Sequence, residues 1–385
     1  MKYTGFTFSG KPLAALSIGC MRFPDRENAG RVIKKCVESQ AIYLDTSPAY
    51  CFHSEEENTE TWVGTAIKGI REKVLLSAKC STGNGGSEIG QYDPKLGFSI
   101  TTADQVRREI EQSLKRLNVD RLDFYQLWAV HSPVIFEEAF KKGGWLEGVQ
   151  KARDEGLFTY LGITGHGNSE EIKKWVDSGC FEIITVPYNI FDISRLDGIE
   201  YALGRNIAVV AMNPLAGGML GGKNEFLSKE FSEFGIDSTV DLALRYVTSS
   251  GKVSALAGMS FEEHAIENVD IMRKGHLLPE VAELARKKLL ELTDTSKMAC
   301  TSCGYCMPCP NGINIPEVLK IRNYARVLGL EWAKDQLKNR HNWDDGFKLE
   351  KCSECGSCES KCPNSVKIID LLNEIKSENG RCADV

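Results

Sequence analysis

The chain has 385 residues, of which 42% are hydrophobic and 26% are charged, and its formal net charge is −6. This composition is that of a soluble globular protein with room for one large domain and one small domain. It excludes a membrane span, since no apolar run nears about 20 residues, and it gives no reason to expect a nucleic-acid partner.

Eight short apolar runs, each followed by an amphipathic stretch, predict eight strands. They are Leu16–Gly19, Ala41–Asp45, Val74–Lys79, Asp123–Trp128, Tyr160–Thr164, Phe181–Val186, Ile207–Met212 and Val253–Gly258. This alternation predicts a parallel (β/α)8 barrel, a TIM barrel of the α/β class, over residues 1–280. A doubly wound open sheet is the alternative, but the glycine-rich fingerprint expected after its first strand is missing.

Four residue pairs have the spacing of capping boxes and predict where helices begin. They are Ser54 with Glu57, Thr102 with Gln105, Asn168 with Glu171, and Ser260 with Glu263. The glycine-rich loop over residues 80–100 is too long for an ordinary connection, which suggests a lid or a substrate wall.

The carboxyl ends of barrel strands carry the catalytic groups of such folds. These ends hold Asp45, Lys79 and Trp128, and Tyr50 and His131 follow shortly afterwards. We expect the Lys79 ammonium, held by Asp45, to lower the pKa of the Tyr50 phenol toward neutrality, so that Tyr50 can exchange a proton. An ordinary ion pair beside a core tyrosine is the alternative.

Two glycine-containing segments lie where barrels of this type commonly bind phosphate. Gly217 and Gly218 follow the seventh strand, Gly258 ends the eighth, and Ser260 lies two residues later. Such glycines let the backbone approach a pyrophosphate closely, although they also make plain turns.

Eight of the 14 cysteines lie in two runs near the C-terminal end, and each run finishes in Cys-Pro. In two-cluster ferredoxins, three thiolates of one run bind one cubane and the fourth ligates the other cubane. We therefore expect one [4Fe-4S] cluster on Cys300, Cys303, Cys306 and Cys362, and a second on Cys352, Cys355, Cys358 and Cys309.

The spacing leaves alternatives open. The first run has two residues before Cys309 where bacterial ferredoxins have three, so a single cluster is the fallback. Structural zinc competes, although zinc sites use separated Cys-x2-Cys pairs. Disulfides are not expected, because the N-terminus lacks an apolar signal segment and indicates a cytoplasmic, reducing location. The clusters suggest a niche with little oxygen.

The strand signal stops after residue 280. Helices are expected over Val281–Leu292, Ile315–Leu328, Leu330–Asn339 and Lys367–Ser377. Residues 281–385 therefore read as a small helical ferredoxin-like iron–sulfur domain rather than a β-rich one.

Five barrel segments share one resemblance: Tyr43–Thr46 with Tyr50, Leu76–Lys79, Asp123–Leu127, Gly162–His166 and Pro187–Asn189. They are similar to the aldo-keto reductase superfamily, and Cys303–Pro310 resembles its branch with an appended 4Fe-4S ferredoxin-type domain. The resemblance covers essentially the whole chain. It implies an oxidoreductase that reduces carbonyls with hydride from NAD(P)H through an Asp, Tyr, Lys, His tetrad, and the first three members match Asp45, Tyr50 and Lys79.

The fourth member of the tetrad does not carry over. Trp128 occupies its position, and an indole can donate one hydrogen bond but cannot relay a proton. His131 is the candidate substitute. Relatives with another residue at this position reduce activated carbon–carbon double bonds, so an enone is a second substrate class.

The resemblance also implies a nicotinamide site. Thr164, Gly165 and Asn189 correspond to the carboxamide region, and Met212 stands where an aromatic side chain stacks on nicotinamide. Gly258 and His264 replace the Lys and Arg that commonly hold the 2′-phosphate of NADPH, so the preference for NADH or NADPH stays open.

Three functions fit these features. One is a nicotinamide-dependent reductase of a small molecule whose clusters connect it to a ferredoxin or a partner subunit. Another receives its electrons through the clusters, with the barrel holding substrate or a flavin, although no sequence feature assigns a flavin. The third is a sensing or binding protein with structural clusters.

Overall fold

The computed structural model describes residues 1–80, 102–130, 133–218, 220–221, 229–292, 300–301, 303–326, 333–334, 337 and 344–380. Eight parallel strands close into a barrel in the order β10-β3-β4-β5-β6-β7-β8-β9. They are β3 (Leu16–Gly19), β4 (Tyr43–Asp45), β5 (Leu75–Cys80), β6 (Leu122–Val130), β7 (Phe158–Gly165), β8 (Ile183–Pro187), β9 (Ala208–Met212) and β10 (Val253–Gly258). The predicted barrel is confirmed, with its eight strands at or near their predicted positions.

An antiparallel hairpin that the sequence reading missed precedes the barrel. Its strands are β1 (Tyr3–Phe8) and β2 (Lys11–Ala14). Phe8 packs edge-on against Phe124, with 4.8 Å between ring centroids, and also contacts Tyr160. Because Phe124 and Tyr160 lie near the starts of β6 and β7, the hairpin covers the amino end of the barrel and leaves the carboxyl end open.

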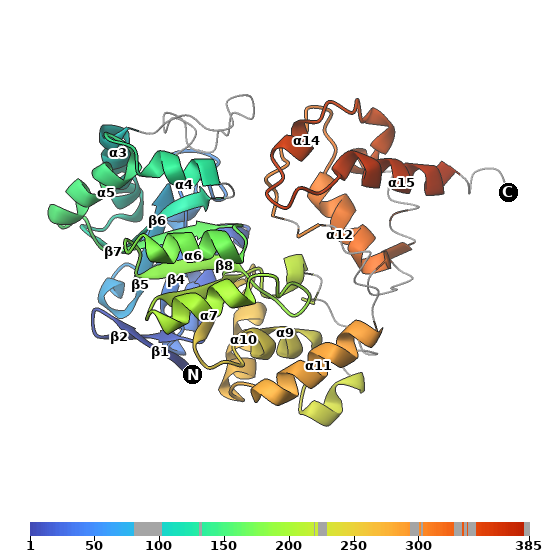
Figure 1. The fold of residues 1–385 in the computed structure, drawn as a ribbon, viewed down its shortest axis with the longest axis horizontal. Helices are drawn as coiled ribbons and strands as arrows, with labels where there is room; N and C mark the ends of the chain where they lie inside the picture. Colours follow the sequence, from blue (N-terminus) through green and yellow to red (C-terminus); the bar gives the residue numbers. More distant parts are fainter. Residues whose placement is uncertain are drawn as a thin grey trace.

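Helices surround the barrel (Figure 1). They are α1 (Arg26–Glu38), α2 (Thr59–Ala66), α3 (Ala103–Leu117), α4 (Pro133–Ala139), α5 (Trp145–Asp154), α6 (Ser169–Asp177), α7 (Leu196–Gly204), α9 (Thr239–Val247), α10 (Glu262–Arg273) and α11 (Pro279–Leu292). No helix in the described part of the chain is long and apolar enough to span a membrane.

Two of the four predicted capping boxes are confirmed. Thr102 caps α3 and Asn168 caps α6, each reciprocally with the residue three positions later. The predictions at Ser54 and Ser260 are wrong. Asn58, with both an amide acceptor and an amide donor, caps α2 instead, and α10 begins after Phe261 without a side-chain cap.

The second domain has its own apolar core, which includes Ile315, Leu319, Phe347 and Leu372. Its helices are α12 (Ile315–Arg326), α14 (Ser357–Ser360) and α15 (Ile368–Gly380), and its described residues contain no strand. They gather beside the barrel in Figure 1. The helical character predicted for this domain holds over these residues, whereas most of the helix expected over Leu330–Asn339 lies outside the described part.

The helix α11 packs with the barrel, although the sequence reading assigned it to the second domain. Its residues Ala282, Ala285 and Leu289 belong to the core that the barrel strands form. The Arg286 guanidinium also donates to the Ile190 carbonyl oxygen over 3.1 Å. The structural division between the domains therefore follows α11 rather than residue 280.

Candidate active site

An ion pair buried at the carboxyl end of the barrel forms the base of the site. Neighbouring strands β4 and β5 present Asp45 and Lys79 there, and both residues are almost fully buried. The Lys79 ammonium donates to the Asp45 carboxylate over 2.5 Å and to the Tyr50 hydroxyl over 3.2 Å. The structure thus brings together the three groups that the sequence singled out.

The pKa of Tyr50 departs from the sequence prediction. We expected Lys79 to lower it, but burial raises the pKa of the phenol well above its usual value and the Asp45 carboxylate raises it further. Burial also raises the pKa of Asp45, against the opposing effect of Lys79. Because burial and the Asp45 carboxylate both disfavour the phenolate, the Tyr50 phenol stays protonated, which suits it to donate a proton.

Gln126 orients this group and was not recognised from the sequence. Its amide nitrogen lies 3.0 Å from a carboxylate oxygen of Asp45 and 2.8 Å from the Ser77 hydroxyl. Its amide oxygen accepts a hydrogen bond from Thr185 over 3.1 Å. A buried glutamine inside a barrel requires such partners, which is the signal that could have identified it.

A backbone irregularity follows Trp128 on β6. The register between β6 and β7 shifts between Leu127 and Val130, and Ala129 adopts a left-handed conformation with φ 60°. Bulges of this kind re-aim a side chain. The Trp128 ring meets the Tyr50 ring edge-on at 6.1 Å. The proposed substitute His131 lies outside the described residues.

One cavity of about 770 Å³ extends from Asp45, Tyr50 and Lys79 to the residues that were predicted to bind a nicotinamide dinucleotide. This volume is in the range of ligand pockets. Most of the predicted site residues line it: Asp45, Tyr50, Lys79, Trp128, Thr164, Gly165, Met212, Gly217, Gly218, Gly258, Ser260 and His264.

Asn189 does not line this cavity. Its amide oxygen accepts hydrogen bonds from the backbone N–H groups of Phe191 and Asp192, each over 3.0 Å. The side chain is almost fully buried and holds the turn after β8. Its expected contact near a nicotinamide carboxamide is therefore not supported by its position.

The loop after β9 forms the far wall of the cavity. Asn213 accepts a hydrogen bond from the Gly217 N–H through its side-chain oxygen, and Gly218 has φ +90°, which glycine adopts readily. The Tyr324 hydroxyl of α12 donates to the Gly218 carbonyl oxygen over 2.6 Å. Lys223, a cation that follows these glycines in the sequence, lies outside the described residues.

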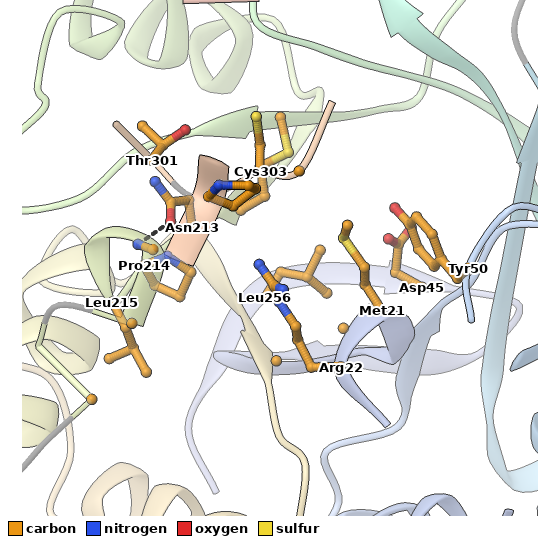
Figure 2. Close-up of a pocket in the computed structure, with 18 of the residues that line it drawn as sticks. Met21, Arg22, Asp45, Tyr50, Asn213, Pro214, Leu215, Leu256, Thr301 and Cys303 are labelled. Atoms are coloured by element: carbon orange, nitrogen blue, oxygen red, sulfur yellow. Dashed lines mark hydrogen bonds between the residues drawn. The ribbon is translucent and has the colours of Figure 1, made fainter. Parts of the chain in front are cut away.

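The second domain supplies the remaining wall, which sequence reasoning missed. Thr301 and Cys303 face the same cavity as Asp45 and Tyr50 (Figure 2). Tyr305 and Lys320 also line it. Across the domain boundary, a ring nitrogen of His166 lies 3.3 Å from the Asn364 side-chain oxygen. A sequence without an alignment carries no signal for such contacts.

The cysteine thiols of the second domain lie near one another. Cys306 interacts electrostatically with Cys300, Cys303 and Cys358, and Cys303 with Cys362. A separate small cavity is lined by all four members of the second predicted set, Cys309, Cys352, Cys355 and Cys358, with Cys306 beside them.

The described residues contain no group of three or more histidine, cysteine, aspartate or glutamate side chains placed as they would be around a bound metal ion. Tetrahedral zinc takes four such groups around one ion, whereas a cubane takes one thiolate at each of four irons. The expectation of clusters rather than zinc therefore rests on the spacing of the cysteines in the sequence.

Comparison with protein families gives two matches. The model of the aldo/keto reductase family matches residues 15–288. A 4Fe-4S dicluster domain model matches residues 299–367. The two matches follow one another along the chain in the same order as the barrel and the helical domain.

Individual proteins are similar over the barrel. The uncharacterized oxidoreductase YqkF of Bacillus subtilis is 25% identical over 293 residues, which cover 70% of this chain and 90% of that protein. The holo form of an aldo-keto reductase from Bacillus halodurans is 24% identical with a TM-score of 0.58, covering 74% of this chain and 95% of that one. An aldo-keto reductase from Klebsiella pneumoniae in complex with NADPH is 20% identical with a TM-score of 0.59, covering 75% and 95%. At these identities the solved structures support the fold.

Proposed function

Because the chain belongs to the aldo/keto reductase family and carries a 4Fe-4S domain after its barrel, we propose that it reduces a carbonyl compound with NAD(P)H. The observation that carries this proposal is the single cavity, which the Asp45, Tyr50 and Lys79 side chains share with the glycine loops after β9 and β10. An enone is the second substrate class, since Trp128 replaces the family's histidine.

Reduction of a carbonyl to an alcohol requires a hydride and a proton. A bound nicotinamide would supply the hydride, an electron pair with its hydrogen, to the carbonyl carbon. The Tyr50 hydroxyl supplies the proton to the carbonyl oxygen, and the raised pKa of Tyr50 keeps that proton in place beforehand. Lys79, 3.2 Å from the hydroxyl oxygen, then stabilises the negative charge left on it.

The residues around the cavity fit a dinucleotide. Gly217 and Gly218 present backbone close to the cavity, and a side chain at Gly258 would come within 2.9 Å of Arg22. Arg22 and Lys320 add cations to the lining, and cations suit a pyrophosphate. NADPH is the dinucleotide named for the Klebsiella pneumoniae structure. For this chain the proposal includes either NADH or NADPH.

The second domain is proposed to hold two [4Fe-4S] clusters, on the two cysteine sets given above. Cys303 lines the barrel cavity, so one cluster would lie directly beside the substrate. A ferredoxin or a similar carrier would then exchange electrons with the clusters in an oxygen-poor cytoplasm.

The position of Cys303 favours a second candidate function. A cluster beside the cavity could deliver electrons one at a time, without nicotinamide, to a substrate or a flavin held in the barrel. Two such electrons and two protons would give the same alcohol, and Tyr50 would supply one of the protons.

Anaerobic protein with its full iron content separates the two functions. We would titrate it with NADH and NADPH, and then follow oxidation of the dinucleotide at 340 nm with 4-nitrobenzaldehyde as the carbonyl probe. Binding and probe-dependent oxidation of either dinucleotide support the first function. Absence of both, with turnover from dithionite-reduced clusters, supports the second.

A further inference from the structure

Tyr305 belongs to the cluster domain, but its side chain faces the barrel. It lies between Cys303 and Cys306, after Gly304, whose φ of +85° turns the chain. The Tyr305 side chain is half-buried and lines the same cavity as Tyr50 and Lys79. Tyr305 therefore lies between two predicted cluster ligands in the sequence.

The contacts of Tyr305 are with residues at the carboxyl ends of barrel strands. The Trp128 side chain hydrogen-bonds the Tyr305 phenol. Tyr50 and Lys79 lie close enough to this phenol to influence its pKa. The Tyr305 ring meets the His166 ring edge-on, with 6.0 Å between centroids. Tyr305 thus lies beside Trp128 at the catalytic end of the cavity.

Hydrogen-bond chemistry determines what this phenol can offer. An indole only donates, so Trp128 uses a lone pair of the Tyr305 oxygen and leaves the hydroxyl hydrogen available. Among the described residues, no acceptor takes that hydrogen. Because Tyr305 lines the cavity, a molecule bound there can accept this hydrogen.

We propose that Tyr305 is a substrate-contacting residue that donates a second hydrogen bond to the carbonyl oxygen that Tyr50 protonates. Trp128 positions Tyr305 through the indole N–H. A carbonyl oxygen has two lone pairs and can accept from both phenols, and the developing negative charge strengthens both bonds. Tyr305 transfers no proton, so the stoichiometry of the reaction is unchanged. The inference rests on the proposed carbonyl reduction.

The barrel alone supplies one phenol donor, and the second comes from a loop that a cluster would hold. The active site is then complete only when both domains are folded together. This gives the iron–sulfur domain a role in substrate binding that does not depend on electron transfer.

The test compares the wild type with Tyr305→Phe, which removes only the hydroxyl. Tyr201→Phe is the matched control, since the Tyr201 hydroxyl donates to Asp177 over 2.7 Å on the outside of the barrel. Iron and sulfide content, the dissociation constant of 4-nitrobenzaldehyde by quenching of protein fluorescence, and kcat and KM with the preferred dinucleotide would be measured anaerobically.

We expect Tyr305→Phe to keep its iron, to bind the probe about 5-fold more weakly and to lose kcat on the order of 100-fold. Tyr201→Phe should match the wild type. Trp128→Phe should lower kcat in the wild type but add little in Tyr305→Phe, since both changes act through one phenol.

Two results would overturn the proposal differently. Wild-type probe affinity and kcat in an iron-replete Tyr305→Phe would remove the role of Tyr305 and leave carbonyl reduction intact. A wild type that neither binds nor reduces the probe with either dinucleotide would refute the proposed function, and the role of Tyr305 with it.

Discussion

Trp128 of the barrel hydrogen-bonds Tyr305 of the cluster domain, and this contact places a phenol beside Tyr50 and Lys79. At the opposite wall of the cavity, the Tyr324 hydroxyl holds the Gly218 carbonyl over 2.6 Å. The second domain therefore closes the cavity at both the catalytic end and the glycine-loop end.

Tyr50→Phe should remove the proton donor without disturbing the fold. We expect the rate of carbonyl reduction to fall about 10²- to 10⁴-fold, while iron content and dinucleotide affinity stay at wild-type values. Steady-state kinetics and iron analysis of the same preparation would show this. If Tyr50→Phe kept most of its turnover, Tyr50 could not be the proton donor.

Lys79→Met should destabilise the barrel by about 3–5 kcal/mol, because it leaves the buried Asp45 carboxylate without its cation. Adding Asp45→Asn should recover part of this loss. Urea unfolding followed by circular dichroism would measure both. Lys151→Met is the control: Lys151 pairs with Glu147 over 3.0 Å on the surface, so its loss should leave the stability close to that of the wild type. Equal stability of Lys79→Met and the double variant would contradict the account.

Glu109 of α3 should make stability depend on pH. Burial raises its pKa from 4.5 to about 7, with Arg116 opposing and Glu60 reinforcing the shift. The folded state therefore binds the proton more tightly than the unfolded state, and this stabilisation is complete below pH 4.5 and lost as pH rises through 7.

Glu109→Gln should remove that dependence. Between pH 4.5 and pH 8, the wild type should therefore lose at most about 3 kcal/mol more unfolding free energy than Glu109→Gln loses. Unfolding free energies across this range provide the measurement. Glu111→Gln, at an exposed position of the same helix, should follow the wild-type curve. Parallel curves for Glu109→Gln and the wild type would show that Glu109 titrates normally.

Iron analysis tests whether each cysteine run supplies one ligand to the cluster of the other run. Cys309→Ser and Cys362→Ser should each reduce about eight irons per chain to about four, through loss of different clusters. Cys180→Ser, in the barrel, should keep all of them. If the wild type carried only about four irons and Cys309→Ser kept all of them, the result would support the single-cluster interpretation.

The barrel could be predicted because each strand is a short apolar run, and parallel strands end at the same edge. The positions of Asp45, Lys79 and Trp128 at strand ends were therefore enough to bring them together. The hairpin over residues 3–14 was missed because it lies outside the strand–helix alternation. Ser54 was favoured over Asn58 as a cap because spacing alone does not show which turn the chain makes.

The pKa of Tyr50 could not be read from the sequence, because it depends on how deeply the phenol is buried and on how fully Asp45 pairs with Lys79. Tyr305 was unpredictable for a related reason. It lies far along the chain from Trp128, and their contact exists only because the second domain packs on the barrel. Local patterns contain no information about such packing.

The most direct test of hydride delivery in this cavity uses NADH or NADPH carrying two deuterium atoms at C4 of the nicotinamide. The protein would reduce 4-nitrobenzaldehyde anaerobically in ordinary water, and mass spectrometry would locate deuterium in the alcohol. The account predicts one deuterium on the carbinol carbon of essentially every product molecule. Alcohol that carries no deuterium there would contradict it and indicate electrons delivered through the clusters or a flavin.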